Sequence, residues 1–385
     1  LTGRNNVRFG FEFNQYQTAA MSTYGLPATE KTMADRLQAA GYRTGVIGKW
    51  HLGERPPFMP TQRGFDVWHG MISGGHDYRT CRLDAGTSAH NGPLLEGADN
   101  RRVGFTGHLT AHLGSKAVEF VQAAPAKPWF LYLAFNAPHA PHDAAEEDLK
   151  AVAGVSDPVR KKYGGLVVGL DRAVGRVLKA LDESGQRERT LVFFLSDNGG
   201  NAGNPHLDPR NAGREKAQWI QYSDNAPLSG HKHSLWEGGI RVPFVVSWPG
   251  RIPAGTVDAP VWSLDIASTA LAAAGAPKQA DADGVDLLPF LTKATATPPR
   301  DELFIRYRIE PTSGRMLRMG PLKLLHNEGA LKLFDVVADP GEKHDLAATR
   351  PEDLTRLEAR WKQLEAEMKP VLWEAGWRQG KDTEP

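Results

Sequence analysis

Short apolar runs alternate with stretches of helical spacing along the first three quarters of the chain. The runs have the length of buried strands and end in loops rich in Gly, Asn, Asp, Pro and His. These strands are predicted at 42–47, 129–135, 191–195 and 243–247. Apolar residues recur every three or four positions beside them, which predicts helices at 32–40, 110–123, 158–181 and 264–274. The alternation predicts an α/β domain whose single layered sheet carries helices on both faces.

The pattern changes near residue 298. Pro298 and Pro299 are typical of a connector. Beyond them, short alternating segments predict a small antiparallel sheet at 303–308, 316–325 and 331–336, and an amphipathic stretch predicts one covering helix at 354–368. We therefore predict a larger domain over 1–297 and a C-terminal subdomain over 298–385.

The composition narrows the class of function. The 385 residues include 46 Lys and Arg against 45 Asp and Glu, so no global charge favours nucleic acid as a partner. No apolar run approaches the ~20 residues that span a bilayer. The single cysteine, Cys81, excludes an intramolecular disulfide and a multi-cysteine metal site. Any affinity for an anion must therefore be built from local groups.

The first stretch with candidate chemistry is GYRTGVIGKWHLG at 41–53. If the chain stays extended from Ile47 to His51, the side chains of Lys49 and His51 project to one face, because strand side chains alternate with a period of two. A cation and a titratable imidazole would then share one pocket. The alternative is a surface lysine and a hydrogen-bonded structural histidine beside a buried Trp50.

Two further apolar runs end in polar groups. The run 191–195 delivers Asp197 and Asn198 to its carboxyl end, where ligands bind in α/β sheets, and their oxygens suit a hard cation such as Ca²⁺ or Mg²⁺. The alternative there is an Asx-type turn followed by two glycines. The run 129–135 leads to His139, which neighbouring prolines restrict, so it is a candidate proton donor or anion ligand. His142 is predicted at the rim.

The last stretch, GHKHSLWEGGIRVP at 230–243, contains Lys232. This residue supplies either a second fixed positive charge or a solvated side chain.

Together and in order, these stretches resemble the sulfatase family of the alkaline phosphatase superfamily. The matching patterns are G-Y-x-T-x-x-x-G-K-W-H-L-G, A-P-H-x-P, S-D-N-G-G, K-x-x-x-W-E-G-G-I-R-V-P and the late D-P-G-E turn at 339–342. Leu1 to Arg4 resemble the tail of the family's first signature, whose Cys or Ser becomes formylglycine. The resemblance implies that this nucleophile, and further metal ligands, lie upstream of Leu1. Cys81 lacks the signature's context and is predicted to be an ordinary thiol.

The resemblance implies a metal-dependent sulfuric ester hydrolase, arylsulfatase-like, with an alkaline-phosphatase-like fold and its catalytic domain over 1–297. It assigns Asp197 and Asn198 to a Ca²⁺ site, with Mg²⁺ as the alternative. Lys49 and Lys232 would bind sulfate oxygens and act in catalysis. His139 would bind or protonate the bridging oxygen and His51 would assist release of sulfate, although the two roles are exchangeable. The chain as given is expected to be inactive, and the intact protein would need a formylglycine-generating or sulfatase-maturing enzyme.

Two other functions stay open. A phosphate or phosphonate ester hydrolase of the same superfamily would use the same cation and lysines, and a non-catalytic remnant would only bind sulfated glycans. Aryl, carbohydrate and alkyl sulfates all remain candidate substrates, selected by loops at 70–91 and 201–229. These loops contain His76, His206, Arg210, Arg214 and Trp219. The resemblance favours a periplasmic or secreted protein, and the absence of an N-x-S/T sequon is compatible with a bacterial source.

Overall fold

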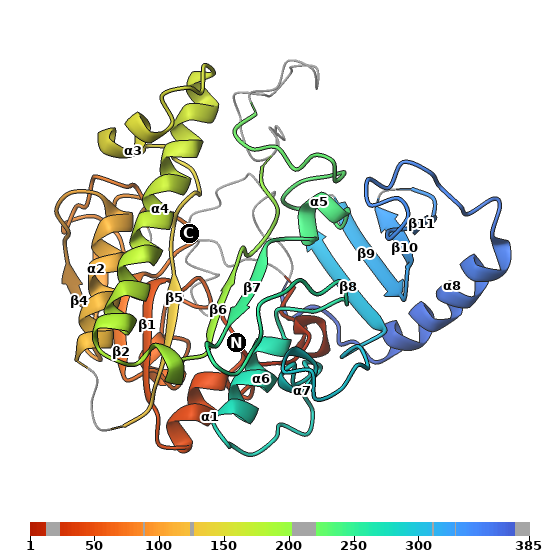
Figure 1. Cartoon of the computed structure of the whole chain (residues 1–385), viewed down its shortest axis with the longest axis horizontal. Coiled ribbons are helices and arrows are strands. Elements are labelled where there is room, and N and C mark those ends of the chain that lie inside the picture. Colours follow the sequence, from red (N-terminus) through yellow and green to blue (C-terminus); the bar gives the residue numbers. More distant parts are fainter. Residues whose placement is uncertain are drawn as a thin grey trace, which may run out of the picture.

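The computed structural model describes residues 1–12, 24–87, 89–123, 127–201, 221–309, 312–327 and 329–373. Within them, an α/β body adjoins a smaller antiparallel sheet, with one helix on the outer side of that sheet (Figure 1). This arrangement confirms the predicted fold class. The division at residue 297 stays a prediction.

The main sheet has five strands in the order β4-β3-β2-β1-β5. The central strand β1 (Arg43–Lys49) runs parallel to both of its neighbours, β2 (Val67–Met71) and β5 (Trp129–Ala134). The edge strands β3 (Leu94–Glu96) and β4 (Arg101–Val103) are antiparallel, which makes the sheet mixed. The prediction included β1 and β5 but not the other three strands.

Helices cover both faces of this sheet, as predicted. Ile47 packs on one side with α2 (Leu109–Gln122) and α4 (Pro158–Glu183). Its neighbour Val46 points to the other side and packs with Trp50 and Trp68. There α1 (Met33–Ala39) lies against β1 and α6 (Asp265–Ala273) against α1. The alternation of strand side chains thus divides the core into two layers.

Strands β6 (Val192–Leu195) and β7 (Phe244–Ser247) form a separate antiparallel ladder. Their existence was predicted, but the prediction that they join the main sheet is wrong for the described residues. The end of β6 and the start of β7, where Leu195 pairs with Phe244, still lie near the site described below. Short helices in the connections are α3 (Glu146–Ala151), α5 (Glu237–Ile240) and α7 (Leu288–Leu291), and 3-10 turns are η1 (Asn6–Phe9), η3 (Pro60–Gln62) and η4 (Arg187–Arg189).

The C-terminal sheet has the strand order β11-β10-β9-β8 and is antiparallel throughout. Its strands are β8 (Glu302–Ile309), β9 (Thr312–Met319), β10 (Leu322–Asn327) and β11 (Lys332–Asp335). The single predicted segment 316–325 is two strands, because the chain turns at Gly320 with a φ of 56°. Helix α8 (Pro351–Ala366) covers the sheet with Leu357, Trp361 and Leu364, as its spacing predicts.

The first residues of the chain pack into this C-terminal core. Val7 is fully buried among apolar side chains of the sheet and α8. The Asn5 side chain donates to Phe304 O at 3.0 Å, and the backbone amides of Lys369 and Leu372 donate to Val7 O and Gly10 O at 3.1 and 2.9 Å. The two ends of the described chain are therefore joined. No helix among the described residues is long and apolar enough to cross a membrane.

Candidate active site

Five of the six predicted site residues lie at or beyond the carboxyl ends of three strands. Lys49 is the last residue of β1 and His51 follows it, while His139 follows β5 and Asp197 and Asn198 follow β6. Because β1 and β5 are parallel neighbours, with Gly48 opposite Ala134, their ends meet at one edge. Lys232 reaches the same place from a loop after residue 229.

His51 reaches the site by a different backbone path from the one predicted. Its φ is 54°, in the left-handed region, so the chain is not extended from Ile47 to His51. The amides of Trp50 and His51 donate to Met71 O and Ile72 O, both at 3.0 Å, which places the turn beside the end of β2. The prediction that strand alternation aligns Lys49 with His51 is therefore wrong.

Two consecutive glycines, Gly74 and Gly75, lie against the imidazoles of His51 and His139. A Cβ atom at Gly74 would lie 2.8 Å from Cε1 of His51, and one at Gly75 would lie 3.2 Å from Nδ1 of His139. The Gly75 position also lies 3.6 Å from Cε1 of His90, an exposed side chain. The two rings pack against neighbouring backbone positions that can accommodate only glycine without movement.

The charges of the site act on one another. Burial lowers the pKa of Lys49, the negative Asp197 opposes that change, and Lys232 adds to it. Burial likewise lowers the pKa of Lys232, again opposed by Asp197. The two ammonium groups therefore face one exposed carboxylate and repel each other. A bound anion would relieve this repulsion.

His139 is kept neutral in the absence of an anion. Burial, with the positive charges of Lys232 and Lys49, lowers the pKa of His139 to about 4. Its Nδ1 lies 2.8 Å from Ala140 O, so in the neutral ring Nδ1 carries the hydrogen and donates it. Tyr78 donates to the His139 carbonyl at 2.9 Å and fixes the backbone. The remaining nitrogen, Nε2, is the one that can exchange a proton.

Backbone hydrogen bonds join the Asp197 turn to the Lys232 loop. The amide of Gly199 donates to Gly239 O at 2.9 Å, and the amide of Lys232 donates to Gly200 O at 3.1 Å. The side chain of Asn198 donates to Gly199 O at 2.9 Å. Asp197, Asn198 and Lys232 are therefore positioned as one unit.

Sequence reasoning missed one titratable member of the site. Burial and the charges of Lys232, His231 and His139 lower the pKa of His233 to about 4, so His233 lies near the catalytic candidates. Its φ is 69°, an uncommon left-handed conformation for a side chain of this kind. The position of His233 directly after Lys232 could have indicated it. However, histidines flank Lys232 on both sides, and no local pattern shows whether His231 or His233 faces the site.

The other sequence candidates lie around this cluster or outside the described residues. His142 stacks on Tyr222 with ring centroids 3.9 Å apart. His76 is buried between the carbonyls of Asp77 and Gly92 and is structural. Cys81 donates from its thiol to Gly92 O at 3.4 Å, as expected of an ordinary thiol. Four predicted rim residues lie outside the described residues: His206, Arg210, Arg214 and Trp219.

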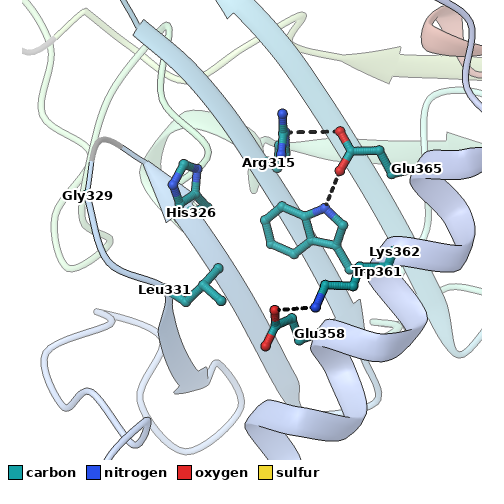
Figure 2. A pocket seen from close by; sticks show the side chains of 8 residues that line it. All are labelled: Arg315, His326, Gly329, Leu331, Glu358, Trp361, Lys362 and Glu365. Carbon is teal, nitrogen blue, oxygen red and sulfur yellow. Dashed lines mark hydrogen bonds and ion pairs between the residues drawn. The ribbon is translucent and has the colours of Figure 1, made fainter.

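A separate cavity of about 320 Å³ lies between β9, β10 and α8 (Figure 2). Its charged groups are paired with one another: Arg315 Nε lies 3.2 Å from Glu365, which also accepts from Trp361, and Lys362 lies 2.7 Å from Glu358. None of the six predicted site residues lines it. Of these contacts, the pair between Arg315 on β9 and Glu365 on α8 links the helix to the sheet.

Two family models match the chain. The model described as Sulfatase matches residues 1–276, and the model described as N-sulphoglucosamine sulphohydrolase, C-terminal, matches residues 231–369. The N-acetylgalactosamine-6-sulfatase of Mus musculus is 34% identical over 76% of this chain and 56% of that protein. Arylsulfatase G of Canis lupus familiaris is 31% identical over 90% of this chain and 67% of that protein. The chain spans about half the length of the N-acetylgalactosamine-6-sulfatases that it matches.

Comparison with solved structures gives the same fold. The crystal structure of Ps i-CgsB in complex with k-i-k-neocarrahexaose is 30% identical, with a TM-score of 0.87 over 99% of this chain and 83% of that chain. BT4656 in complex with D-Glucosamine-2-N, 6-O-disulfate is 18% identical, with a TM-score of 0.71 over 95% of this chain and 86% of that chain, and shares the fold. Because the Sulfatase model matches more than half of its residues, the chain belongs to the sulfatase family.

Proposed function

We propose that the protein is a sulfatase, which hydrolyses the sulfate ester of a carbohydrate or aryl alcohol to the alcohol and inorganic sulfate. The observation that carries this proposal is the convergence of two half-buried lysines and a neutral histidine on Asp197. Membership of the sulfatase family supports it.

Lys49 and Lys232 are proposed to bind the sulfate oxygens. Both are partly desolvated and repel each other, so a sulfate group between them restores charge balance. Their charges are held in place before the reaction begins, which favours the extra negative charge of the transition state without reorganisation.

His139 is proposed to protonate the departing alcohol oxygen. Burial, together with the charges of Lys232 and Lys49, lowers the pKa of His139 and keeps the ring neutral; a bound sulfate offsets the two positive charges and so raises this pKa toward protonation. The proton then sits on Nε2, because Nδ1 donates to Ala140 O. His51, whose ring lies against Gly74, is proposed to assist the release of sulfate.

Substrates with different leaving groups separate the two histidines. A nitrophenolate departs without a proton, whereas a sugar alcohol needs one. His139→Ala is expected to lower kcat/KM for a sugar sulfate about 10²–10⁴-fold and for nitrophenyl sulfate much less. His51→Ala is expected to affect both substrates alike. The opposite pattern would exchange the two roles.

Asp197 and Asn198 are proposed as ligands of a Ca²⁺ ion, with Mg²⁺ as the alternative. Two oxygen donors at a strand end fit a hard cation, and Asn198 uses its NH₂ group toward Gly199, which leaves its carbonyl oxygen for a ligand. Among the described residues no group of three acidic, His or Cys side chains could hold a metal, so these two are part of a larger set. When bound, the cation would polarise the sulfate group.

The nucleophile is proposed to be a formylglycine in a segment preceding Leu1, installed by a formylglycine-generating or sulfatase-maturing enzyme. It would supply the attacking hydroxyl. Mass spectrometry of the protein made from its complete coding sequence tests this, since an aldehyde in place of Cys or Ser changes the peptide mass. We also propose a periplasmic or secreted location.

A carbohydrate sulfate is the proposed substrate class. The names of the relatives support it, since one is an N-acetylgalactosamine-6-sulfatase and a 30% identical structure holds a neocarrahexaose. The complete protein should release sulfate from N-acetylgalactosamine 6-sulfate or a sulfated galactan oligosaccharide and should cleave nitrophenyl sulfate faster than nitrophenyl phosphate. A faster phosphate reaction would support the phosphate ester hydrolase instead. Binding of sulfated glycans without turnover by an aldehyde-bearing protein would support the non-catalytic alternative.

A further inference from the structure

The loop that carries Lys232 and His233 is held from two sides. On one side are the amide bonds to the Asp197 turn, from Lys232 N to Gly200 O and from Gly199 N to Gly239 O. On the other side lies the C-terminal sheet, whose β8 and β9 approach α5 at the end of this loop (Figure 1). The contacts on that second side come from residues with no part in the proposed chemistry.

A buried ionic triad forms the main contact. Lys323, on β10, donates a hydrogen bond to Glu237 at 2.9 Å and forms an ion pair with Oε1 of Glu342 at 2.8 Å. Glu342 also accepts from the backbone amide of Glu237 at 2.6 Å, at the start of α5. All three side chains are less than 5% exposed.

The triad is costly unless it is complete. A buried lysine and two buried carboxylates lose their hydration, and their mutual attraction is the main compensation for that loss. Burial raises the pKa of Glu342 although Lys323 and the Glu237 amide act against that rise. Glu342 also has a left-handed φ of 52°, which its backbone must keep for the carboxylate to accept from that amide. These contacts attach Glu237, the first residue of α5, to Lys323 and Glu342 and so hold the end of the loop that precedes the helix.

Three neutral hydrogen bonds extend the triad along the loop. Ser229 donates from its hydroxyl to Gly341 O at 2.6 Å, and the Gly238 amide donates to Ser229 O, also at 2.6 Å. Tyr307, on β8, donates to His233 O at 2.9 Å. Both ends of the loop and its middle are therefore tied to the C-terminal sheet or to the turn at 339–342.

We propose that the C-terminal sheet is a positioning part of the active site, in which Lys323, Glu237 and Glu342 set the place of Lys232 and His233. This rests on the proposed function only in assigning sulfate to Lys232. The triad residues do not touch substrate in this proposal. They act through the loop, so their loss should change sulfate affinity in protein that is still folded.

The test uses Glu342→Gln in the protein made from its complete coding sequence. Glutamine keeps the shape and can still accept from the Glu237 amide, but it loses the charge that attracts Lys323. The expected result is a rise of about tenfold in the inhibition constant of inorganic sulfate together with a fall in kcat, because the displaced Lys232 charge acts mainly in the transition state. Amide hydrogen exchange at Lys232 and Gly238 should accelerate at least tenfold. Tyr307→Phe should produce a smaller change of the same kind, and it keeps the triad in case Glu342→Gln does not fold.

Glu302→Gln is the matched control. Glu302 lies on β8 of the same sheet and pairs with Arg360 on α8 at 2.7 and 2.9 Å, away from the loop. Glu302→Gln should lower the melting temperature without changing the inhibition constant of sulfate or the amide hydrogen exchange of Lys232 and Gly238. Equal exchange at Lys232 in Glu342→Gln and Glu302→Gln would overturn the positioning proposal. Faster exchange in Glu342→Gln, in a protein that neither binds sulfate nor cleaves its esters, would support positioning and reject the proposed function.

Discussion

Gly74 determines how closely the His51 ring can lie to the backbone. A methyl group there would meet Cε1 of His51 at 2.8 Å, so Gly74→Ala must displace the ring. A displacement of about 1 Å in a reacting group costs up to ~10²-fold, and we expect kcat/KM to fall by ten- to a hundredfold. Gly86→Ala, in the same connection, meets nothing within 4 Å and is the control. Equal activity of the two variants would show that His51 has room to move.

Lys232 should contribute mainly to the transition state. Lys232→Met keeps most of the side-chain volume but removes the charge, and loss of one such group costs about 10²–10³-fold in kcat. Lys179→Met, an exposed lysine on α4, should leave the rate unchanged. Steady-state kinetics with nitrophenyl sulfate measure both. A loss confined to KM would mean that Lys232 binds substrate and transition state equally.

Single residues also show what the sequence could predict of the site. The identity of Lys49, Asp197 and Lys232 could be predicted because each follows an apolar run or lies in a recognisable pattern. The turn at His51 could not, since a left-handed φ depends on contacts with Met71 and Ile72 rather than on neighbours in sequence. The roles assigned to these residues stay predictions.

At the scale of elements, the centre of the main sheet depends on glycines facing across strands. A Cβ at Gly70 on β2 would lie 1.9 Å from Gly48 O on β1. Gly70→Ala must therefore separate β1 from β2, and overpacking of this kind costs about 1–3 kcal/mol or more of the free energy of unfolding.

A second glycine, Gly175, supplies a control in which alanine should raise the free energy of unfolding instead of lowering it. Gly175 is exposed on α4 and has nothing within 4 Å of its Cβ position. Gly175→Ala should raise the free energy of unfolding by about 0.5–1 kcal/mol, because alanine favours the helix. Urea denaturation of both variants checks the two signs. If Gly70→Ala also stabilised the protein, the close approach of β1 and β2 would be incorrect.

Helices and strands whose apolar residues recur at regular spacing could be predicted from the sequence. Strands that lack such a pattern, and the pairing of strands with one another, could not. The helices at 109–122 and 158–183 have apolar stripes of the expected spacing, and β1 and β5 are apolar runs. Strand β2 contains a glycine and a histidine, and it forms because β1 offers a parallel edge. Likewise β6 and β7 were visible as runs, but which strand each one pairs with is decided by contacts distant in sequence.

At the scale of the whole molecule, a pair formed by the buried His69 and the half-buried His112 makes stability depend on pH. His69 Nε2 lies 2.9 Å from His112 Nε2, and His69 Nδ1 lies 3.1 Å from Glu96. Burial, with the charges of His69 and Lys116, lowers the pKa of His112 to about 4, although Glu119 and Glu96 oppose this. Burial lowers the pKa of His69 as well, against the hydrogen bond that His69 Nδ1 donates to Glu96. The folded state therefore binds fewer protons than the unfolded state between about pH 4 and 6.5.

The free energy of unfolding should consequently fall as the pH drops from 6.5 to 4, and above pH 6.5 this histidine pair should no longer reduce it. His112→Gln cannot be protonated but can still donate to His69, so it should make the decline between pH 6.5 and 4 shallower. Urea midpoints at several pH values measure the slope, with the exposed His344→Gln as control. Identical slopes for all three proteins would place the acid sensitivity elsewhere.

The enclosure of residues 5–10 by the end of the chain has a consequence for synthesis on the ribosome. The carbonyls of Val7 and Gly10 accept hydrogen bonds from the amides of Lys369 and Leu372, and Val7 enters a core built from residues after 303. At roughly 5–20 residues per second, these early residues emerge on the order of 20 to 70 s before their partners. Throughout that interval Val7 lacks its native cover, so the nascent chain exposes an apolar segment to chaperones until residues 369–372 have been made.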